Sequence, residues 1–456
     1  MKRIVSLLLT AVLLTAMLSV FVLPASAEGE VSKSENATWF ENSKDPVWWE
    51  LTEGRTKLTV GGKGNMPYYF AAVPELDKRP WKDYIETITT VVIDSGVENI
   101  GDFAFCGCTN LTSVTIPASV TSIEDSAFRD CKSLQRVTIP YGVNTIGANA
   151  FFGCKGLTSI VISSGVTRIC SDAFRNCTSL QSVTIPSSVT SIDQNAFQGC
   201  TSLQSVTIPY GVTRINQNAF YGCANLQSVT IPPSVTRIDG FAFYGCTSLQ
   251  SVTIPSSVQS IGNSAFNGCR KLASVTVKTS TPPTLGQMVF NGILGNLAIY
   301  VPCGSWTAYQ QASGWSDKSG QIKEAYIVDD QPGENGTIML DKDCFPVGNF
   351  AEEQTVTVSV VPDEGYQLQA DSLTVSYKDG EEEKTVELTQ DETDPTKYSF
   401  EMPKANVTLK AAFEAISDGT GSILSGGNLW IILGVVAAVL VAVIAALVVV
   451  KKKGNE

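Results

Sequence analysis

Cysteine is the one residue type in this chain that could do chemistry in a fixed pattern, and histidine is absent from all 456 residues. Without histidine the chain lacks Ser-His-Asp and Cys-His nucleophiles, imidazole metal sites and the usual pH switch. A thiolate metal site is disfavoured too, because Cys-x-x-Cys pairs are missing and Cys106-Gly-Cys108 is the closest approach. No acid pair, activated nucleophile or phosphate loop stands outside the repeats. We therefore expect no enzyme, no cofactor and no metal site.

Eight of the twelve cysteines stand 23 residues apart, at Cys108, Cys131, Cys154, Cys177, Cys200, Cys223, Cys246 and Cys269. In one interior column they could pair as four disulfides between adjacent coils, because a spacing of about 4.8 Å lies within the allowed Cα range. Side chains in a column run parallel, however, which suits stacked thiols better than the twisted disulfide geometry. We favour buried free thiols that act as small hydrophobic groups. The sequence does not pair Cys106, Cys170, Cys303 and Cys344, which lie outside this cysteine ladder.

The elements that position these cysteines are copies of one 23-residue unit. Phenylalanines keep the same step at Phe105, Phe128, Phe151, Phe174, Phe197, Phe220, Phe243 and Phe266, and leucines repeat it from Leu111 to Leu272. An unbroken fixed period predicts a solenoid, in which each unit stacks only on its neighbours. Within one copy, Leu180, Val183 and Ile185 indicate a short strand, and Pro186 then turns the chain. The predicted fold class is mainly β.

The unit C-x-x-L-x-x-V-x-I-P-x-x-V-x-x-I-x-x-x-A-F-x-x-C resembles the BspA-like leucine-rich repeats of bacterial and some protist surface proteins. The resemblance covers the predicted solenoid, residues 85–277. Residues 28–84 resemble the N-terminal capping segment of such proteins, and residues 278–325 their C-terminal cap. Capping has a physical reason, since an open solenoid end exposes apolar core. The resemblance implies adhesion and partner binding at a cell surface, without catalysis.

The two ends of the chain indicate its compartment. Residues 1–27 have the basic start, apolar run and Ala-Ser-Ala site of a signal peptide, with an uncleaved anchor helix as the alternative. Residues 429–450 are 22 uncharged residues, long enough at about 33 Å for a transmembrane helix rather than a buried core helix. Three lysines follow, so we expect 451–456 to be a cytoplasmic tail and residues 28 to about 425 to lie outside. The prediction is a single-pass cell-surface protein.

Residues 326–414 differ in composition from the repeats. They hold 20 acidic and 6 basic residues, whereas 86–277 hold 10 of each. Alternating segments separated by turn residues predict a small all-β module. The Pro-Asp-Glu-Gly-Tyr string at 362–366 and the Phe-Glu-Met-Pro string at 400–403 resemble the divergent internalin-type B repeat, which implies a stalk or weak binding unit. Residues 415–428 read as a Gly/Ser linker.

The acid clusters of this module, at 381–383 and 391–394, could be considered for calcium. EF-hand spacing is not present, and solvated charge on a β module is the favoured interpretation. The net charge of −12 argues against nucleic acid as a partner, since phosphate binding needs clustered lysine and arginine.

Candidate ligand contacts are the places where the repeat surface is not uniform. Most coils present serine and threonine columns, which could hydrogen-bond a glycan or another strand edge, although β-propensity and solubility are the favoured explanation. Arginines break the pattern at Arg168, Arg214 and Arg237; inter-coil salt bridges to Asp193 and Asp239 are the default explanation and an anionic ligand is the sharper one. Exposed aromatic candidates are Tyr141, Tyr210, Tyr221 and Tyr244.

Two functions from different classes remain. In the first, the solenoid binds a host protein, a matrix component or a glycan without covalent chemistry, and the C-terminal helix holds it in the membrane. In the second, the protein is a structural envelope element or spacer without a specific ligand. Binding modules vary between coils at their surface columns, whereas scaffolds stay uniform. This chain is mostly uniform, with local variation at the tyrosine and arginine positions.

Overall fold

The computed structural model describes residues 38–39, 47–69, 77–333, 335–341, 344–346, 355–363 and 365–416. The predicted signal peptide (1–27), transmembrane helix (429–450) and cytoplasmic tail (451–456), and nearly all of the linker, lie outside these residues. Within the described ranges, no helix is both long enough and apolar enough to cross a membrane.

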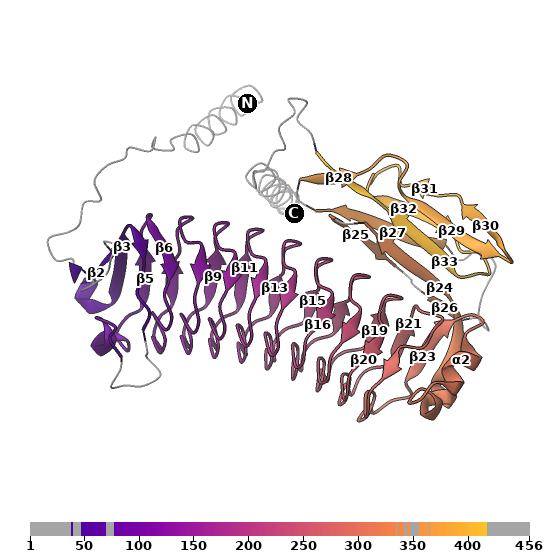
Figure 1. The fold of residues 1–456 in the computed structure, drawn as a ribbon, viewed down its shortest axis with the longest axis horizontal. Helices are drawn as coiled ribbons and strands as arrows, with labels where there is room; N and C mark the ends of the chain where they lie inside the picture. Colours follow the sequence, from indigo (N-terminus) through magenta and orange to yellow (C-terminus); the bar gives the residue numbers. More distant parts are fainter. Residues whose placement is uncertain are drawn as a thin grey trace, which may run out of the picture.

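Each solenoid coil contributes two short strands, and equivalent strands of successive coils lie side by side (Figure 1). The first strands are β5 (Thr90–Ile93), β7 (Ser113–Thr115), β9 (Arg136–Ile139), β11 (Ser159–Ile162), β13 (Ser182–Thr184), β15 (Ser205–Thr207), β17 (Ser228–Thr230), β19 (Ser251–Ile254) and β21 (Ser274–Val277). The second strands are β6 (Val97–Ile100), β8 (Ser122–Ile123), β10 (Thr145–Ile146), β12 (Arg168–Ile169), β14 (Ser191–Ile192), β16 (Arg214–Ile215), β18 (Arg237–Ile238), β20 (Ser260–Ile261) and β22 (Thr284–Leu285). Pairing is parallel with the 23-residue step, as in Ser205↔Ser228 and Arg214↔Arg237, so the predicted solenoid is confirmed.

The phenylalanine column forms the centre of the core. All eight rings are fully buried, and neighbouring centroids lie 5.2–5.5 Å apart. The column is longer than the sequence period predicts. Trp81 stacks on Phe105 at 5.8 Å, and Phe290 stacks on Phe266 at the same distance. Trp315 then closes the far end at 6.2 Å from Phe290.

A left-handed backbone position precedes each Ala-Phe pair of the repeats, with φ between 55° and 59°. Asparagine, aspartate or serine occupies most of these positions, and asparagine and aspartate adopt this conformation more readily than other residues with a side chain. Two coils are exceptions, because Phe103 and Phe241 adopt the same φ with bulky aromatic side chains. A bulky residue there is strained, and such strain is often found at functional sites.

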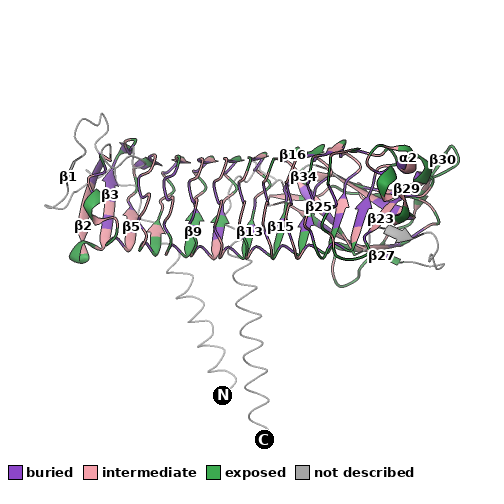
Figure 2. Ribbon diagram, turned by 90° about the horizontal axis from the view of Figure 1, so that it is seen from below, coloured by how far each residue is buried: buried purple, intermediate pink, exposed green. Residues whose placement is uncertain are grey.

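Both ends of the solenoid are covered. At the N-terminal end, β1 (Thr38–Trp39), β2 (Val47–Thr52) and β3 (Lys57–Gly62) form a sheet that continues into β5, and β4 (Gly64–Asn65) pairs with β6. At the C-terminal end lie β23 (Ala298–Pro302), the helix α2 (Trp306–Gln311) and the 3-10 turn Ser316–Gln321. Seen at right angles in Figure 2, the coils form a long stack with buried residues along its length.

The acidic module is all-β, as predicted. Its strands are β24 (Ile322–Pro332), β25 (Gly336–Leu340), β26 (Cys344–Pro346), β27 (Thr355–Pro362), β28 (Tyr366–Leu368), β29 (Thr374–Asp379), β30 (Glu382–Val386), β31 (Thr389–Gln390), β32 (Lys397–Glu401), β33 (Val407–Ala411) and β34 (Phe413–Ala415). β24 pairs in parallel with solenoid strand β23 and also with module strand β33, so one sheet runs through both parts. The predicted boundary between residues 325 and 326 falls inside β24.

The phenylalanine column gives the first prediction. Phe197 lies between Phe174 and Phe220, with ring centroids 5.3 and 5.5 Å away. Phe197→Ala removes both contacts and leaves a cavity, so we expect it to lower the free energy of unfolding by about 3–5 kcal/mol in urea titrations followed by circular dichroism. Ser205→Ala, at an exposed strand position, is the control and should change it by less than about 0.5 kcal/mol. Similar values for the two variants would contradict the role given to the column.

Candidate ligand-binding surfaces

The ladder cysteines are structural groups in this fold. All eight are free and fully buried. From Cys131 onward, each Sγ donates to the carbonyl oxygen of the phenylalanine 26 residues earlier, at 3.1–3.3 Å. Burial raises the pKa of Cys223 to about 12, so its thiol is neutral at physiological pH. Because the thiolate is the reactive form, these side chains are unsuited to nucleophilic or metal chemistry.

The second strands place two arginines over one buried carboxylate. Arg214 and Arg237 are register partners on β16 and β18. Both donate from Nε to Asp239, each at 2.6 Å, Arg214 across the coils and Arg237 within its own coil. Asp239 is only 5% exposed, whereas the two arginine side chains are 50% and 56% exposed. The predicted inter-coil ion pairs are therefore present, and they hold two guanidinium groups at the surface.

Tyr221 and Tyr244, which the sequence predicts to be exposed, are half-buried on the turns beside this pair, and so is Phe241. Tyr221 and Tyr244 stack at 4.8 Å, and the ring of Phe241 lies 5.8 Å from Tyr244. Phe241 also lines a hollow of about 380 Å³ together with Arg214, Gln217, Arg237, Asp239, Gly240, Gly262 and Asn263. We call Arg214, Arg237, Tyr221, Tyr244 and Phe241 the arginine–tyrosine patch.

The patch unites four of the seven predicted contacts and adds one that sequence reasoning missed. The signal for Phe241 was in the sequence, since a phenylalanine occupies a position that is Asn, Asp or Ser in most coils. Arg168 lies two coils away and pairs with Asp193 at 2.8 Å. Tyr141 is 66% exposed at a separate turn. Tyr210 belongs to a different surface.

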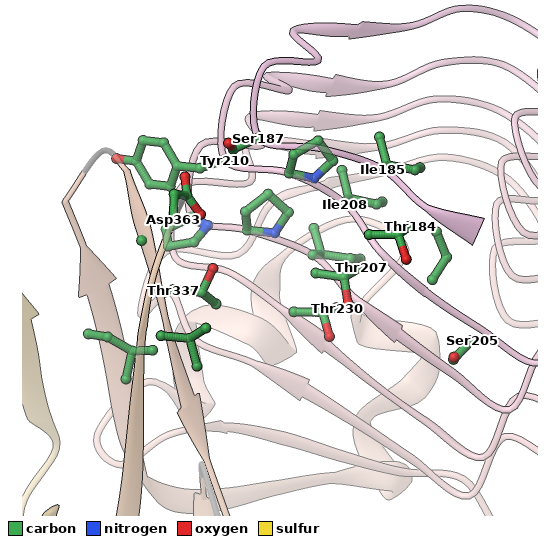
Figure 3. A pocket seen from close by; sticks show the side chains of 18 of the residues that line it. Thr184, Ile185, Ser187, Ser205, Thr207, Ile208, Tyr210, Thr230, Thr337 and Asp363 are labelled. Carbon is green, nitrogen blue, oxygen red and sulfur yellow. The ribbon is translucent and has the colours of Figure 1, made fainter. Parts of the chain in front are cut away.

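That surface is a groove between the solenoid and the acidic module. Strands β13, β15 and β17 form one wall, and the β25–β27 end of the module forms the other (Figure 3). The first part encloses about 510 Å³, with Tyr210 and Asp363 at one side. A second part of about 390 Å³ continues along β25 toward Asp341 and Lys278. We call the two parts together the interdomain groove.

Side-chain contacts from β24 and the β27 end hold the module against the solenoid. These contacts are an ion pair between Lys278 and Asp330, hydrogen bonds from Ser256 Oγ to the Asp329 carboxylate at 2.9 and 3.0 Å, and one from Gln331 Nε2 to Ser256 Oγ at 3.2 Å. Ser187 and Asp363 line the same part of the groove from opposite sides. Part of the serine and threonine surface thus faces the module. The B-repeat resemblance implies a stalk or weak binding unit, and nothing in the sequence indicates that the module lies alongside the solenoid strands.

Two of these carboxyl groups are held in an environment that disfavours charge. Burial raises the pKa of Asp329, although the Ser256 hydrogen bond and the Lys278 charge oppose the shift. Burial also raises the pKa of Asp363, against the hydrogen bond with Ser187. Both groups lie at the module–solenoid contact, so ionisation works against docking.

The fold defined by these observations is that of a leucine-rich-repeat solenoid protein with an added β module. Residues 83–204 and 190–303 match the BspA type leucine rich repeat region in six copies, and residues 326–417 match the divergent InlB B-repeat domain. The chain belongs to the BspA-type leucine-rich-repeat proteins and carries a B-repeat domain.

Solved structures with a similar fold come from several bacteria. A leucine-rich repeat protein from Bacteroides ovatus ATCC 8483 is 27% identical over 57% of this chain and 71% of its own, with a TM-score of 0.46. The T. pallidum leucine rich repeat protein is 32% identical over 44% and 86%, with a TM-score of 0.35. A leucine rich cell surface protein from Faecalibacterium prausnitzii A2-165 is 21% identical over 64% and 100%, with a TM-score of 0.27. A search of curated proteins gives no match. The family assignment rests on the two domain matches.

Cysteine reactivity is the second prediction. At about pH 8 a ladder thiol such as Cys223 is neutral and shielded, so iodoacetamide should leave it unmodified in the native chain. Cys303, which is partly exposed, is the internal control and should react faster. After unfolding without reductant, mass spectrometry should find the ladder thiols alkylated. Protection that persists in the unfolded chain would assign disulfides instead.

The third prediction concerns pH. A carboxyl group whose folded pKa is raised contributes more favourably to folding as pH falls through that pKa. We therefore expect the stability of the wild type relative to Asp329→Asn to improve as pH falls from about 7 to about 4. Urea unfolding of both chains at each pH measures the difference. A difference that moves the other way, or does not move, would contradict the assignment of a raised pKa.

Proposed function

We propose that this protein is a cell-surface binding protein that recognises a protein or glycan partner non-covalently through its solenoid. The observation that carries the proposal is the arginine–tyrosine patch, where a regular surface becomes irregular over adjacent coils. A purely structural solenoid does not require strained Phe241, a stacked tyrosine pair and two arginines bound to one carboxylate at the same place. Membership of the BspA-type family supports a binding role over an enzymatic one.

The chemistry of the patch suits a ligand with anionic and planar or ring-shaped groups. Asp239 takes one Nε–H of each arginine, and a guanidinium carries further N–H donors that match carboxylate or sulfate geometry. The tyrosine pair offers broad, rigid contact area with polar hydroxyl ends. Arginine and tyrosine are also the types most often found at interface hot spots.

The proposed location follows from the two termini. A cleaved signal peptide and a single C-terminal helix would leave residues 28 to about 425 outside the cell, with a short cytoplasmic tail. The acidic module would then lie between the solenoid and the membrane in sequence, although it sits beside the solenoid in the fold.

A structural envelope role is the second candidate. The uniform serine and threonine columns favour it, since repeated identical coils suit a spacer. Under that role the chain would have no specific ligand, and loss of the protein would disturb envelope order instead of adhesion.

The fourth prediction tests the patch. Cells that display the full chain are compared for binding to arrays of host and matrix proteins and of glycans. Arg237→Gln and Tyr244→Ala should each weaken the binding detected by about fivefold or more, as expected for hot-spot residues. Arg168→Gln removes the same charge from an ion pair three coils before Arg237 and should leave binding within about twofold. Equal losses for Arg237→Gln and Arg168→Gln would refute the patch, and an absence of any binding would favour the structural role.

A further inference from the structure

One wall of the interdomain groove is the edge of a sheet. The four-stranded sheet of the module has the order β25-β27-β32-β31, so among the strands that the structure describes β25 pairs on one side only. Residues Gly336 to Ile338 line the first part of the groove, and Ile338 to Asp341 line the second. The groove therefore follows the whole length of β25, about 17 Å for five residues.

The register shows which backbone groups face this groove. Asp363 N donates to Asn335 O, and Asp341 N donates to Thr357 O. In an antiparallel ladder hydrogen-bonded pairs alternate with open pairs, so the odd-numbered residues of β25 bond to β27. The N–H and C=O groups of Gly336, Ile338 and Leu340 point the other way. Among the residues that the structure describes, these backbone groups have no strand partner.

The opposite wall is nearly free of charge and combines polar with apolar groups. Outward threonines of neighbouring solenoid strands, Thr184, Thr207, Thr230 and Thr253, line it together with prolines of the turns that follow, among them Pro209 and Pro233. Thr230 lines both parts of the groove and so marks its middle. Rows of hydroxyl groups at strand spacing can accept or donate hydrogen bonds to the side chains or backbone of an extended chain.

The charge of the lining is negative. Asp330, Asp341 and Asp363 supply three carboxylates, and among the described lining residues Lys278 is the one basic side chain, already paired with Asp330. The module as a whole, with these three carboxylates included, holds 20 acidic against 6 basic residues over 326–414. Such a field attracts a basic ligand and repels an acidic one.

We propose that the interdomain groove binds an extended, basic segment of a partner polypeptide, which adds as a strand to the open edge of β25. The backbone of the segment pairs with Gly336, Ile338 and Leu340, as in other cases of strand addition. Its alternate side chains contact the threonine rows, and its lysine or arginine side chains approach the Asp341 and Asp363 carboxylates.

This site is separate from the arginine–tyrosine patch, so either proposal can fail alone. The patch is expected to bind an anionic group and the groove a cationic one. A second copy of this chain is the other candidate occupant, because open strand edges also pair with each other.

The probe is a capped peptide of alternating threonine and lysine, about eight residues long, added to the detergent-solubilised full chain. We expect binding by calorimetry, with slower amide hydrogen exchange over residues 336–340. One control is the same peptide N-methylated at alternate residues, which removes the N–H groups along one edge. When that edge faces β25, its affinity should be at least about tenfold lower than that of the unmethylated peptide. The other control is a threonine–glutamate peptide, whose affinity should be no higher than that of the methylated peptide. Because these probes leave the protein unchanged, misfolding of a variant cannot explain their results.

Two variants then locate the site. Thr230→Trp fills the middle of the groove and should abolish binding of the threonine–lysine peptide. Thr138→Trp is the matched control, since Thr138 is an exposed residue in the same position of an earlier coil and does not line the groove. No binding, binding insensitive to N-methylation, or equal binding by both variants would overturn the proposal. Sedimentation that shows self-association lost in Thr230→Trp would assign the edge to a second copy instead.

Discussion

The structure depends on one constraint: each coil can bury its interior only against the coils on either side. Each phenylalanine ring from Phe128 to Phe243 meets an identical ring above and below, and each parallel strand pairs at the same 23-residue step. Identical neighbours make the packing problem the same in every coil, which is why the interior sequence hardly varies. The cost of this arrangement falls at the ends, where the last ring would face water. Trp81 and Trp315 cover those ends, and both indole N–H groups donate to backbone carbonyls.

The constraint acts on the interior and leaves the surface free to differ. Positions that point outward on the second strands alternate among serine, threonine and arginine without disturbing the core. Arg214 and Arg237 lie in register, so their like charges would repel, and buried Asp239 between them compensates both. The core does not compensate the backbone strain at Phe241. The seven other coils carry Asn, Asp, Ser or Phe at this position and bury their Ala-Phe pair equally well, so packing does not require Phe241 there. A departure that packing does not require is the better sign of a ligand.

The 23-residue period of the sequence was enough to predict the repeat. Contacts between residues that this period does not relate could not be predicted. The fixed step located the cysteine, leucine and phenylalanine columns and the ion pairs between coils. It missed Phe290 and Trp81 because each lies 24 residues from its neighbour in the column, and at Trp81 the residue type changes as well. The interdomain groove could not be predicted from the sequence for a different reason. Ser256 meets Asp329 from 73 residues away, and no periodic signal reports a contact of that kind.

Hydrogen bonds between strands, and not a linker, fix the position of the acidic module relative to the solenoid. Since β24 pairs with β23 on one side and β33 on the other, rotating the module would break a continuous sheet. This continuous sheet keeps β25 facing the solenoid strands. An open strand edge is an aggregation hazard, and proteins often cover such edges with another element. Here the solenoid covers the edge without closing on it, because carboxylates at the contact resist full burial. The remaining space follows one strand along its length, so it excludes bulky folded surfaces and admits an extended chain.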